Sequence, residues 1–208
     1  MTGKLPCKLG ILVSGSGTNL QAIIDSIESG NLNAEICCVI SNNADAYALT
    51  RAKRHGIPAV VHENIGFCDR RQYDAATVEI LRRYNVELVV LAGFVRILSE
   101  AMINAFPNAI MNIHPALLPA FPGLHAQQHA LDYGVRYTGC TVHFVDCGTD
   151  TGPIIIQSVV PVEDGDTEGS LSERIQKAEH LAFPAAIGMY ADGKLIVDGR
   201  HVRMLAEQ

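Results

Sequence analysis

The chain has 208 residues, of which 48% are hydrophobic and 18% charged, so it has enough apolar side chains for a large core and is not intrinsically disordered. Its formal net charge of −6 argues against a general nucleic-acid-binding protein, and we expect no nucleic-acid partner. No apolar stretch approaches the roughly 20 residues of a membrane span, and the start MTGKLPCKLG lacks the apolar core of a signal peptide. We therefore expect a cytoplasmic protein without a membrane partner.

Apolar, strand-like runs alternate with helical segments along the whole chain. The predicted strands cover Lys8–Ser14, Glu35–Ser41, Pro58–His62, Val86–Gly93, Ala109–Ile113, and the runs RYTGCTVHFV and PIIIQSVVPV. The predicted helices cover Asn19–Glu28, Ala44–Arg54, Arg70–Tyr84, Ser99–Ala105, Ala126–Tyr133 and Leu171–Tyr190. This alternation predicts an α/β fold, with an open, mostly parallel twisted sheet and helices on both faces. The connection Cys147–Thr151 is too short for a parallel crossover, so we also expect an antiparallel strand near the edge.

The first predicted strand runs through Ser14-Gly15-Ser16-Gly17-Thr18-Asn19 into a helix. Glycines let the backbone approach a ligand closely, and the first turn of a helix offers free N–H donors, so this segment suits a phosphate. It is neither a Walker loop nor a dinucleotide fingerprint, because Leu20 stands at the third glycine position and no Gly-Lys-Ser/Thr follows. The structural alternative is a tight turn in which Thr18 or Asn19 caps the helix.

Polar residues follow two later strands. Asn112 and His114 are two apart, so they project from the same face of an extended chain. The imidazole can donate or accept a proton near neutral pH, and the amide offers an N–H donor for the oxyanion that develops from a carbonyl. The loop after the sixth strand carries Asp146 and Asp150, and one carboxylate near His114 would raise the pKa of that histidine. The structural alternative for Asn112 and His114 is a polar pair that ends a strand. For Asp146 and Asp150 it is a pair of solvated aspartates in a turn.

Two arginine features stand out against the negative net charge. Arg70 and Arg71 open a predicted helix, where cations oppose the helix dipole, which indicates an external anion or a partner carboxylate. Arg96 follows an apolar strand and suits a flat ligand. The alternative for both residues is a solvated surface arginine, and this alternative fits Arg71 better than Arg96. Glu179, in the late helix, is either exposed or hydrogen-bonded to a sugar.

We expect no metal site. His125 and His129 have helical spacing, but no glutamate lies between them and no third ligand is evident. The six cysteines form no C-x-x-C pair, and Cys37 and Cys38 lie in an apolar run, so reduced, mostly buried thiols are expected rather than a zinc ribbon or a disulfide framework.

Five segments of the chain resemble the folate-dependent formyltransferases: SGSGTNLQAII, SNNADAYAL, LAGFVRIL, NIHPALLPAFPGLHA and GCTVHFVDCGTDTGPIIIQ. The resemblance covers about Lys8 to Pro184, and its most specific part is Asn-x-His-Pro followed by Asp-x-Gly-Pro. It implies a Rossmann-like formyltransferase fold in one domain over residues 1–208. A nucleotide- and phosphate-binding half would cover about 1–106, and a catalytic and folate-binding half about 107–208.

The resemblance also implies an activity and its partners. The activity is transfer of the formyl group of 10-formyltetrahydrofolate, a co-substrate, to the amine of glycinamide ribonucleotide in purine biosynthesis. The transfer would be direct, through a tetrahedral intermediate that Asn112 and a protonated His114 stabilise, with Asp150 keeping His114 cationic. The enzyme would be a monomer or a homodimer.

Site residues are implied in the same way. The catalytic residues would be Asn112, His114 and Asp150. Gly17, Thr18 and Asn19 would bind the ribonucleotide phosphate, and Glu179 its ribose. The folate-binding residues would be Arg70, Val95, Arg96, Ile97, Leu98, Asn112, Asp146, Cys147, Gly148, Thr149 and Asp150. Cys147 and Thr149 depart from the family pattern, which more often has an acidic and a larger apolar residue there.

Three alternatives remain open. A methionyl-tRNA formyltransferase normally adds a C-terminal domain and a basic surface, whereas a short segment follows Pro184 and the net charge is negative. A formyltetrahydrofolate hydrolase normally adds an N-terminal domain, whereas the first predicted strand begins at Lys8. A non-catalytic nucleotide-binding module would keep the Gly-rich loop but would need neither Asn112 nor His114.

Overall fold

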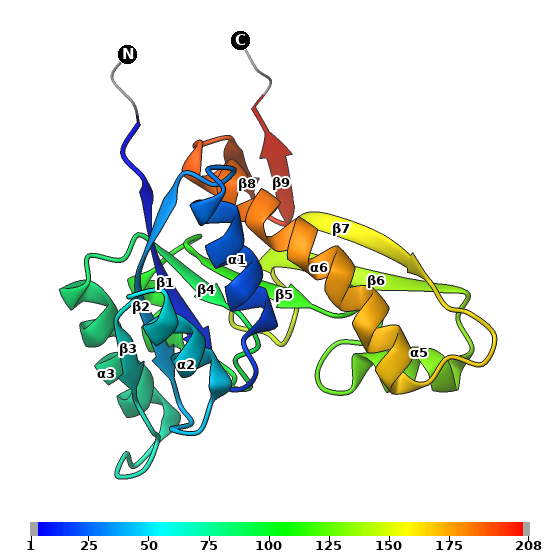
Figure 1. Cartoon of the computed structure of the whole chain (residues 1–208), viewed down its shortest axis with the longest axis horizontal. Coiled ribbons are helices and arrows are strands. Elements are labelled where there is room, and N and C mark those ends of the chain that lie inside the picture. The colour runs from blue at the N-terminus through cyan, green and yellow to red at the C-terminus, as the bar shows by residue number, and fades with distance from the viewer. Residues whose placement is uncertain (1–3, 206–208) are drawn as a thin grey trace. The chain divides into compact units, whose positions relative to one another are not determined.

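A computed structural model describes residues 4–205, and the chain divides into two compact units between Met111 and Asn112. We call the part up to Met111 unit 1 and the part from Asn112 onward unit 2. Strand β5 (Ile110–His114) begins in the first unit and ends in the second. Each unit is described below by itself (Figure 1).

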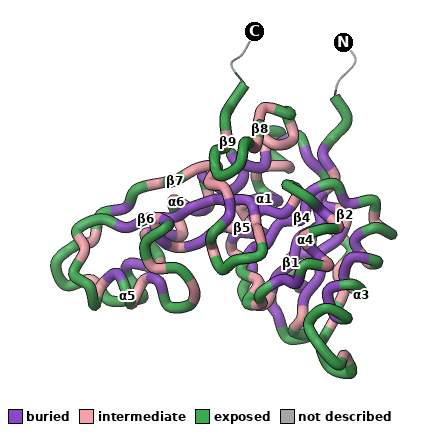
Figure 2. Tube along the Cα trace, turned by 180° about the vertical axis from the view of Figure 1, so that it is seen from behind, coloured by how far each residue is buried: buried purple, intermediate pink, exposed green. Residues whose placement is uncertain are grey.

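Unit 1 contains four further strands and four helices. They are β1 (Cys7–Val13), α1 (Thr18–Glu28), β2 (Ala34–Ser41), α2 (Tyr47–Arg54), β3 (Ala59–Val61), α3 (Arg70–Arg83), β4 (Leu88–Leu91) and α4 (Glu100–Ala105). The strands pair in the order β3-β2-β1-β4, and every pair among them is parallel. Helices α1 and α2 lie on one face of this sheet, and α3 and α4 on the other (Figures 1 and 2).

The core of unit 1 explains why its strands are apolar on nearly every residue. Strand β1 is covered on both faces, and all of its residues except Lys8 are buried. Leu20 and Ile23 of α1 are fully buried on one side, and Leu81 of α3 is fully buried on the other. Helix α3 packs closely at Gly10, where an added Cβ would lie 2.5 Å from the Leu81 side chain, so a larger residue at this position would push the helix away.

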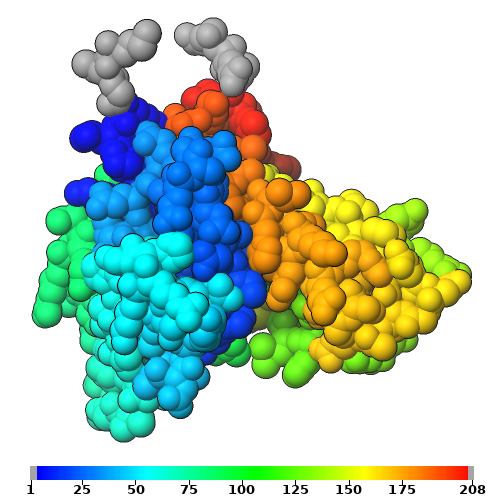
Figure 3. Space-filling view, viewed as in Figure 1, coloured from blue at the N-terminus to red at the C-terminus, as the bar shows by residue number. Residues whose placement is uncertain are grey.

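Unit 2 contains the antiparallel part of the sheet. Its elements after β5 are α5 (Ala126–Tyr133), β6 (Tyr137–Phe144), β7 (Ile154–Pro161), α6 (Glu168–Ala191), β8 (Leu195–Asp198) and β9 (His201–Met204). Strands β6 and β7 pair in antiparallel fashion, as the short connection predicts, and so do β8 and β9. Helix α6 packs on β6 and β7, and its side chains form part of the surface of unit 2, orange in Figure 3.

Helix α6 begins with a capping box, in which the Thr167 hydroxyl accepts the Ser170 amide and the Ser170 side chain accepts the Thr167 amide. Its inner face buries Leu171, Ile175 and Phe183 completely. The predicted fold class is confirmed: parallel strands with helices, and an antiparallel segment near an edge. The sequence analysis did not predict the β8–β9 hairpin. Within residues 4–205, each helix is too short or too polar to cross a membrane.

Candidate active site

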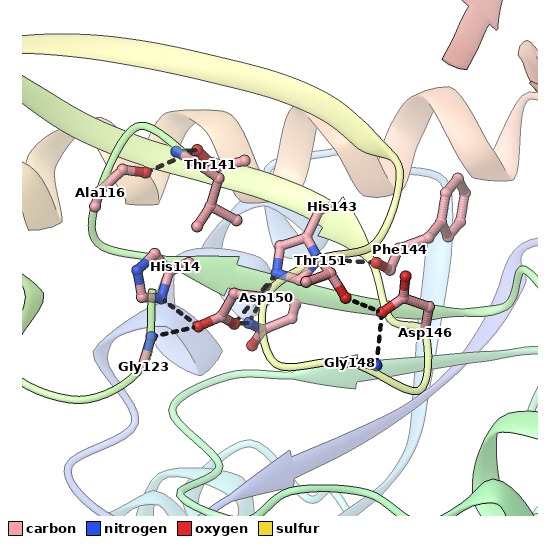
Figure 4. A network of polar contacts seen from close by, with 12 residues as sticks. His114, Ala116, Gly123, Thr141, His143, Phe144, Asp146, Gly148, Asp150 and Thr151 are labelled. Atoms are coloured by element: carbon pink, nitrogen blue, oxygen red, sulfur yellow. Dashed lines mark hydrogen bonds and ion pairs between the residues drawn. The ribbon is translucent and has the colours of Figure 1, made fainter. Parts of the chain in front are cut away.

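The end of strand β5 carries Asn112 and His114, both in unit 2. His114 is directed toward Asp150 in the loop that joins β6 to β7 (Figure 4). Two-residue spacing on a strand puts them on one face, as predicted. His114 is buried, with 4% of its surface exposed, and Asn112 is half-buried.

Asp150 in the β6–β7 loop contacts both residues. Its Oδ2 atom lies 3.3 Å from Nδ1 of His114, and its Oδ1 atom lies 3.5 Å from Nδ2 of Asn112. Oδ2 also accepts a hydrogen bond of 2.8 Å from the backbone amide of Gly123. The structure therefore brings together an imidazole, an amide and a carboxylate from distant parts of the sequence.

Both ring nitrogens of His114 face oxygen acceptors. Nε2 lies 2.8 Å from the carbonyl oxygen of Phe121, so this nitrogen carries a proton, and Nδ1 faces the Asp150 carboxylate. Only the protonated ring donates to both oxygens. The two acceptor residues have left-handed backbone, with φ of 51° at Phe121 and 54° at Asp150, a conformation that costs a non-glycine residue energy and is found mostly where function needs it.

Burial is the largest influence on the pKa of His114. It lowers the pKa of His114 below the ordinary value of 6.5, and the opposing effects of the Asp150 charge and the Phe121 carbonyl do not restore it. Asp150 does raise the pKa of His114, as the sequence analysis expected, but the opposite effect of burial is larger.

Asp150 keeps its charge. Burial alone would raise the pKa of Asp150, but the His143 ring, the Gly123 amide and the charge of His114 together hold it below its ordinary value. A carboxylate therefore stands beside His114 at neutral pH.

His143 on β6 is a site residue that the sequence analysis missed. Its Nδ1 atom lies 2.8 Å from the Phe144 carbonyl oxygen and therefore carries a proton. Its Nε2 atom, 3.1 Å from Nδ2 of Asn112 and 3.7 Å from Oδ1 of Asp150, then accepts from the Asn112 amide. This bond fixes the Asn112 side chain. The signal in the sequence was a single histidine in a strand without Asp, Glu, Lys or Arg, two residues before its polar loop.

The rest of the β6–β7 loop is organised by Asp146. Its Oδ1 atom accepts the Gly148 amide at 3.0 Å and the Thr151 hydroxyl at 2.6 Å (Figure 4). Cys147, Gly148 and Thr149 are exposed. Asp146 thus holds the loop that positions Asp150.

The Gly-rich loop of unit 1 precedes α1 with an unusual cap. Gly17 is the N-cap in left-handed conformation, with φ of 72°, and no side chain caps the helix, so Thr18 and Asn19 are not the caps that the structural alternative required. An added Cβ at Gly17 would lie 2.6 Å from Cβ of Ala48, so only glycine fits. The first-turn amides of α1 have no side-chain acceptor from the cap, which suits an anion.

Arg51 of α2 is bound to this loop and was not predicted. Its Nε atom donates to the Ser16 carbonyl at 2.9 Å, and Nη1 donates to Oε1 of Gln21 at 3.0 Å. The half-buried guanidinium therefore places a positive charge beside the start of α1.

The other predicted residues of unit 1 lie after β4 and at the start of α3. The guanidinium of Arg96 lies 4.5 Å from the Tyr73 ring centroid, and its Nε atom is buried without a hydrogen-bond partner, so the alternative of a fully solvated arginine is wrong. The Val95 amide donates to the Ser14 hydroxyl at 3.0 Å. Val95 and Ile97 are exposed, Leu98 is buried, and Arg70 is the exposed first residue of α3.

In unit 2, Glu179 is buried in α6, with 6% of its surface exposed, so the alternative of a solvated glutamate is wrong. It is close enough to Cys140 to add to the effect of burial, which raises the pKa of that thiol to about 11.

Cysteines and histidines elsewhere form no cluster with metal-ligand character in the described part of the chain. All six cysteines are free, and Cys7, Cys38 and Cys140 are buried. His125 is exposed, with Nδ1 3.9 Å from Oε1 of Glu168.

Comparison with known proteins shows the family to which the chain belongs. Residues 7–187 match the family described as "Formyl transferase". The chain belongs to the formyl transferase family. It is 42% identical over 185 residues to a phosphoribosylglycinamide formyltransferase of Escherichia coli, an alignment that covers 89% of this chain and 87% of that protein.

A solved structure of glycinamide ribonucleotide transformylase 1 from Symbiobacterium toebii is 50% identical, with a TM-score of 0.96 over 98% of this chain and 96% of that one. The trifunctional purine biosynthetic protein adenosine-3 of Chironomus tentans is 46% identical over 188 residues, 89% of this chain, and the chain spans 14% of its length. The match of residues 7–187 therefore places the chain in a family of formyl-transferring enzymes.

Proposed function

We propose that the chain is a phosphoribosylglycinamide formyltransferase, which transfers the formyl group of 10-formyltetrahydrofolate to the amine of glycinamide ribonucleotide in purine biosynthesis. The names of the Escherichia coli and Symbiobacterium toebii relatives support this acceptor. The observation that carries the proposal is the convergence of Asn112, His114 and Asp150 on one space.

The reaction needs no covalent intermediate with the protein. The neutral amine attacks the formyl carbon, the carbonyl oxygen becomes an oxyanion, and the bond from that carbon to N10 of the folate breaks. The amine loses one proton and N10 gains one, so charge and atoms balance. The protein has to orient two substrates, stabilise the oxyanion and move this proton.

Asn112 stabilises the oxyanion. One hydrogen of its amide is held by His143 at 3.1 Å, while the contact of the same nitrogen with Asp150 is longer, at 3.5 Å. The longer contact is the weaker one, so the second hydrogen is available to a substrate oxygen. His143 keeps the amide nitrogen, rather than its oxygen, turned toward the reaction.

His114 takes up charge as the reaction proceeds. In the free protein, burial lowers the pKa of His114, but a negative oxygen close to the ring raises it. The protonated ring already has both of its acceptors, Phe121 and Asp150, in place. His114 is therefore most readily protonated when the oxyanion forms, and it then donates its proton toward the leaving folate nitrogen.

Asp150 is ionised and serves two purposes. It stabilises the charged form of His114, and it holds the water molecule through which the proton of the attacking amine passes to His114, which delivers it to N10. Gly17, Thr18 and Asn19 bind the ribonucleotide phosphate, Arg51 adds positive charge there, and Glu179 binds the ribose. Arg70, residues 95–98 and the loop 146–150 bind the folate.

We further propose that units 1 and 2 form one formyltransferase domain. Because the catalytic side chains all come from one chain, the proposal holds for a monomer or a homodimer. The six free cysteines fit a reducing compartment, so we propose a cytoplasmic location.

The test is to incubate the purified protein with 10-formyltetrahydrofolate, with and without glycinamide ribonucleotide, and to follow tetrahydrofolate and formylglycinamide ribonucleotide by mass spectrometry. We expect both products to appear only with the acceptor and in equal amounts. Folate release without the acceptor would identify a hydrolase instead. Binding of the ribonucleotide without any formyl transfer would identify a non-catalytic module.

A further inference from the structure

Two of the loops that the proposed function assigns to substrates follow neighbouring strands of unit 1. The Gly-rich loop, residues 14–19, follows β1, and the folate segment, residues 95–98, comes after β4. Strands β1 and β4 are paired and parallel, so their carboxyl ends lie at the same end of the sheet. A side chain that joins the two loops at this end therefore acts on both proposed substrate sites.

The hydroxyl of Ser14 makes this connection. Its Oγ atom accepts a hydrogen bond of 3.0 Å from the Val95 amide and donates one of 2.6 Å to Oδ1 of Asn42. Because the single hydroxyl hydrogen is directed at Asn42, a lone pair of the oxygen faces the Val95 amide. The first residue of the Gly-rich loop thus holds the first residue of the folate segment.

The backbone explains why a side chain is needed at this point. The Ser14 amide still donates to the Gly93 carbonyl at 3.0 Å, in continuation of the pairing between β1 and β4. Gly93 itself has left-handed backbone, with φ of 75°, which turns the chain out of the strand direction. The Val95 amide lies beyond this turn and bonds to a side chain of the neighbouring strand end instead of a backbone carbonyl.

Residues 95–98 lie outside every helix and strand, so side-chain contacts hold this segment in shape. Oδ2 of the buried Asp74 accepts the amide of Ser99, directly after the segment. Within the segment, the Arg96 guanidinium lies over the Tyr73 ring. Asp74 and Tyr73 both belong to α3, whereas Ser14 ties the segment to the Gly-rich loop.

We propose that Ser14 is a positioning residue that couples the two substrate sites. A folate bound to residues 95–98 fixes the Val95 amide, and through Oγ of Ser14 it holds the start of the Gly-rich loop. Each ligand then reduces the conformational entropy that remains to be lost when the other binds, so each binds more tightly in the presence of the other. The two affinities change by the same factor. The inference rests on the proposed function, which assigns the two loops to the two substrates.

The test uses two ligands that lack the groups through which the substrates meet. Ribose 5-phosphate keeps the phosphate and the ribose of the acceptor without its glycinamide, and tetrahydrofolate lacks the formyl group. Isothermal titration calorimetry measures the Kd of ribose 5-phosphate with and without saturating tetrahydrofolate. For the unaltered protein we expect tetrahydrofolate to lower this Kd about fivefold, the factor that corresponds to one neutral hydrogen bond.

Variants of the hydroxyl and of its acceptor test the connection itself. Ser14→Ala should reduce the coupling factor to about one, whereas Ser14→Thr keeps a hydroxyl and should retain the coupling. In formyl transfer, Ser14→Ala should raise the KM of both substrates several-fold with kcat unchanged, because the hydroxyl bonds to Val95 and Asn42 and not to reacting groups. Asn42→Ala removes the oxygen that orients the hydroxyl, so it should weaken the coupling by less. If Ser14→Ala does not fold, Asn42→Ala decides the test.

Ser41→Ala is the matched control. Ser41 is the last residue of β2 and lies opposite Val13, the last residue of β1. Its hydroxyl also makes two hydrogen bonds, but both are local: it donates to the Asn43 carbonyl and accepts from the Asn43 amide. This variant should lose a similar amount of stability and keep the full coupling.

Three outcomes would overturn the inference: coupling that survives in Ser14→Ala, coupling that is lost equally in Ser41→Ala, or independent binding of the two ligands to the unaltered protein. The binding measurements need no turnover, so they separate this inference from the proposed function. Coupled binding without formyl transfer to glycinamide ribonucleotide would refute only the proposed function. Formyl transfer without coupled binding would refute only the role of Ser14.

Discussion

The Nδ1 atom of His114 lies 3.3 Å from Oδ2 of Asp150, inside a site where burial lowers the pKa of the histidine. The carboxylate thus raises the pKa of His114, whereas the burial of the ring lowers it. A group held near this balance changes its protonation state when a nearby charge appears, which is what an acyl transfer to an amine produces.

Replacement of Asp150 by asparagine tests the charge at constant shape. Asp150→Asn keeps an oxygen for the Gly123 amide but removes the negative charge from His114, so we expect kcat to fall about 100-fold or more, with little loss of ribonucleotide binding. Steady-state kinetics and calorimetry measure the two effects. Asp164→Asn, at an exposed aspartate that pairs with Arg136, is the control and should keep full activity. Near-normal turnover of Asp150→Asn would exclude the assigned role.

The lowered pKa of His114 also predicts how stability depends on pH. Because the unfolded chain protonates this histidine at a higher pH than the folded one, folding loses free energy as the pH falls through 6.5 toward the folded pKa. A His114→Asn variant has no such loss. The difference in unfolding free energy between the unaltered protein and this variant should therefore shrink from pH 7 to about pH 5, as measured by urea unfolding. A difference that grows on acidification would mean that the folded pKa is raised instead.

The sequence predicts the parallel part of the fold because burial on both faces makes strands such as β1 and β4 apolar throughout. The β8–β9 hairpin escapes prediction because its strands are short and largely exposed, with no long apolar run. Helix bounds are less exact: α2 begins at Tyr47 rather than Ala44, and α6 begins at Glu168 rather than Leu171.

The candidate site, too, could be predicted from the sequence only in part. Asn112 and His114 could be paired from their spacing on one strand, but the bond of His143 to Asn112 joins two strands, and the position of His143 in its strand does not predict this partner. The sequence predicts that a carboxylate raises the pKa of His114, but the larger and opposite effect of burial depends on the packing of the whole unit and has no local signal. Arg51 was missed because its contact with Ser16 depends on where α2 packs.

Gly17 provides a prediction about the phosphate loop. Gly17→Ala combines a left-handed backbone, φ 72°, with a contact of 2.6 Å to Ala48, so it must displace the loop or α2. We expect a loss of stability above the roughly 1 kcal/mol of backbone strain alone, and a KM for glycinamide ribonucleotide at least about tenfold higher. Gly30→Ala has nearly the same φ, 76°, but meets no atom within 4 Å, so it isolates the strain. Equal behaviour of the two variants would show that the contact with Ala48 is unimportant.

Arg51 provides the complementary prediction, because it stabilises the same loop by charge and hydrogen bonding. Arg51→Ala removes the bonds to Ser16 and Gln21 and one positive charge beside the first turn of α1. The KM for glycinamide ribonucleotide should rise about tenfold, and its dependence on salt should weaken, while kcat and folate binding stay unchanged. Arg54→Ala is the matched control, since Arg54 lies on the same helix but bonds to Tyr47 rather than to the loop. If both variants raise the KM equally, the effect belongs to the general charge of α2 and not to the guanidinium that contacts Ser16.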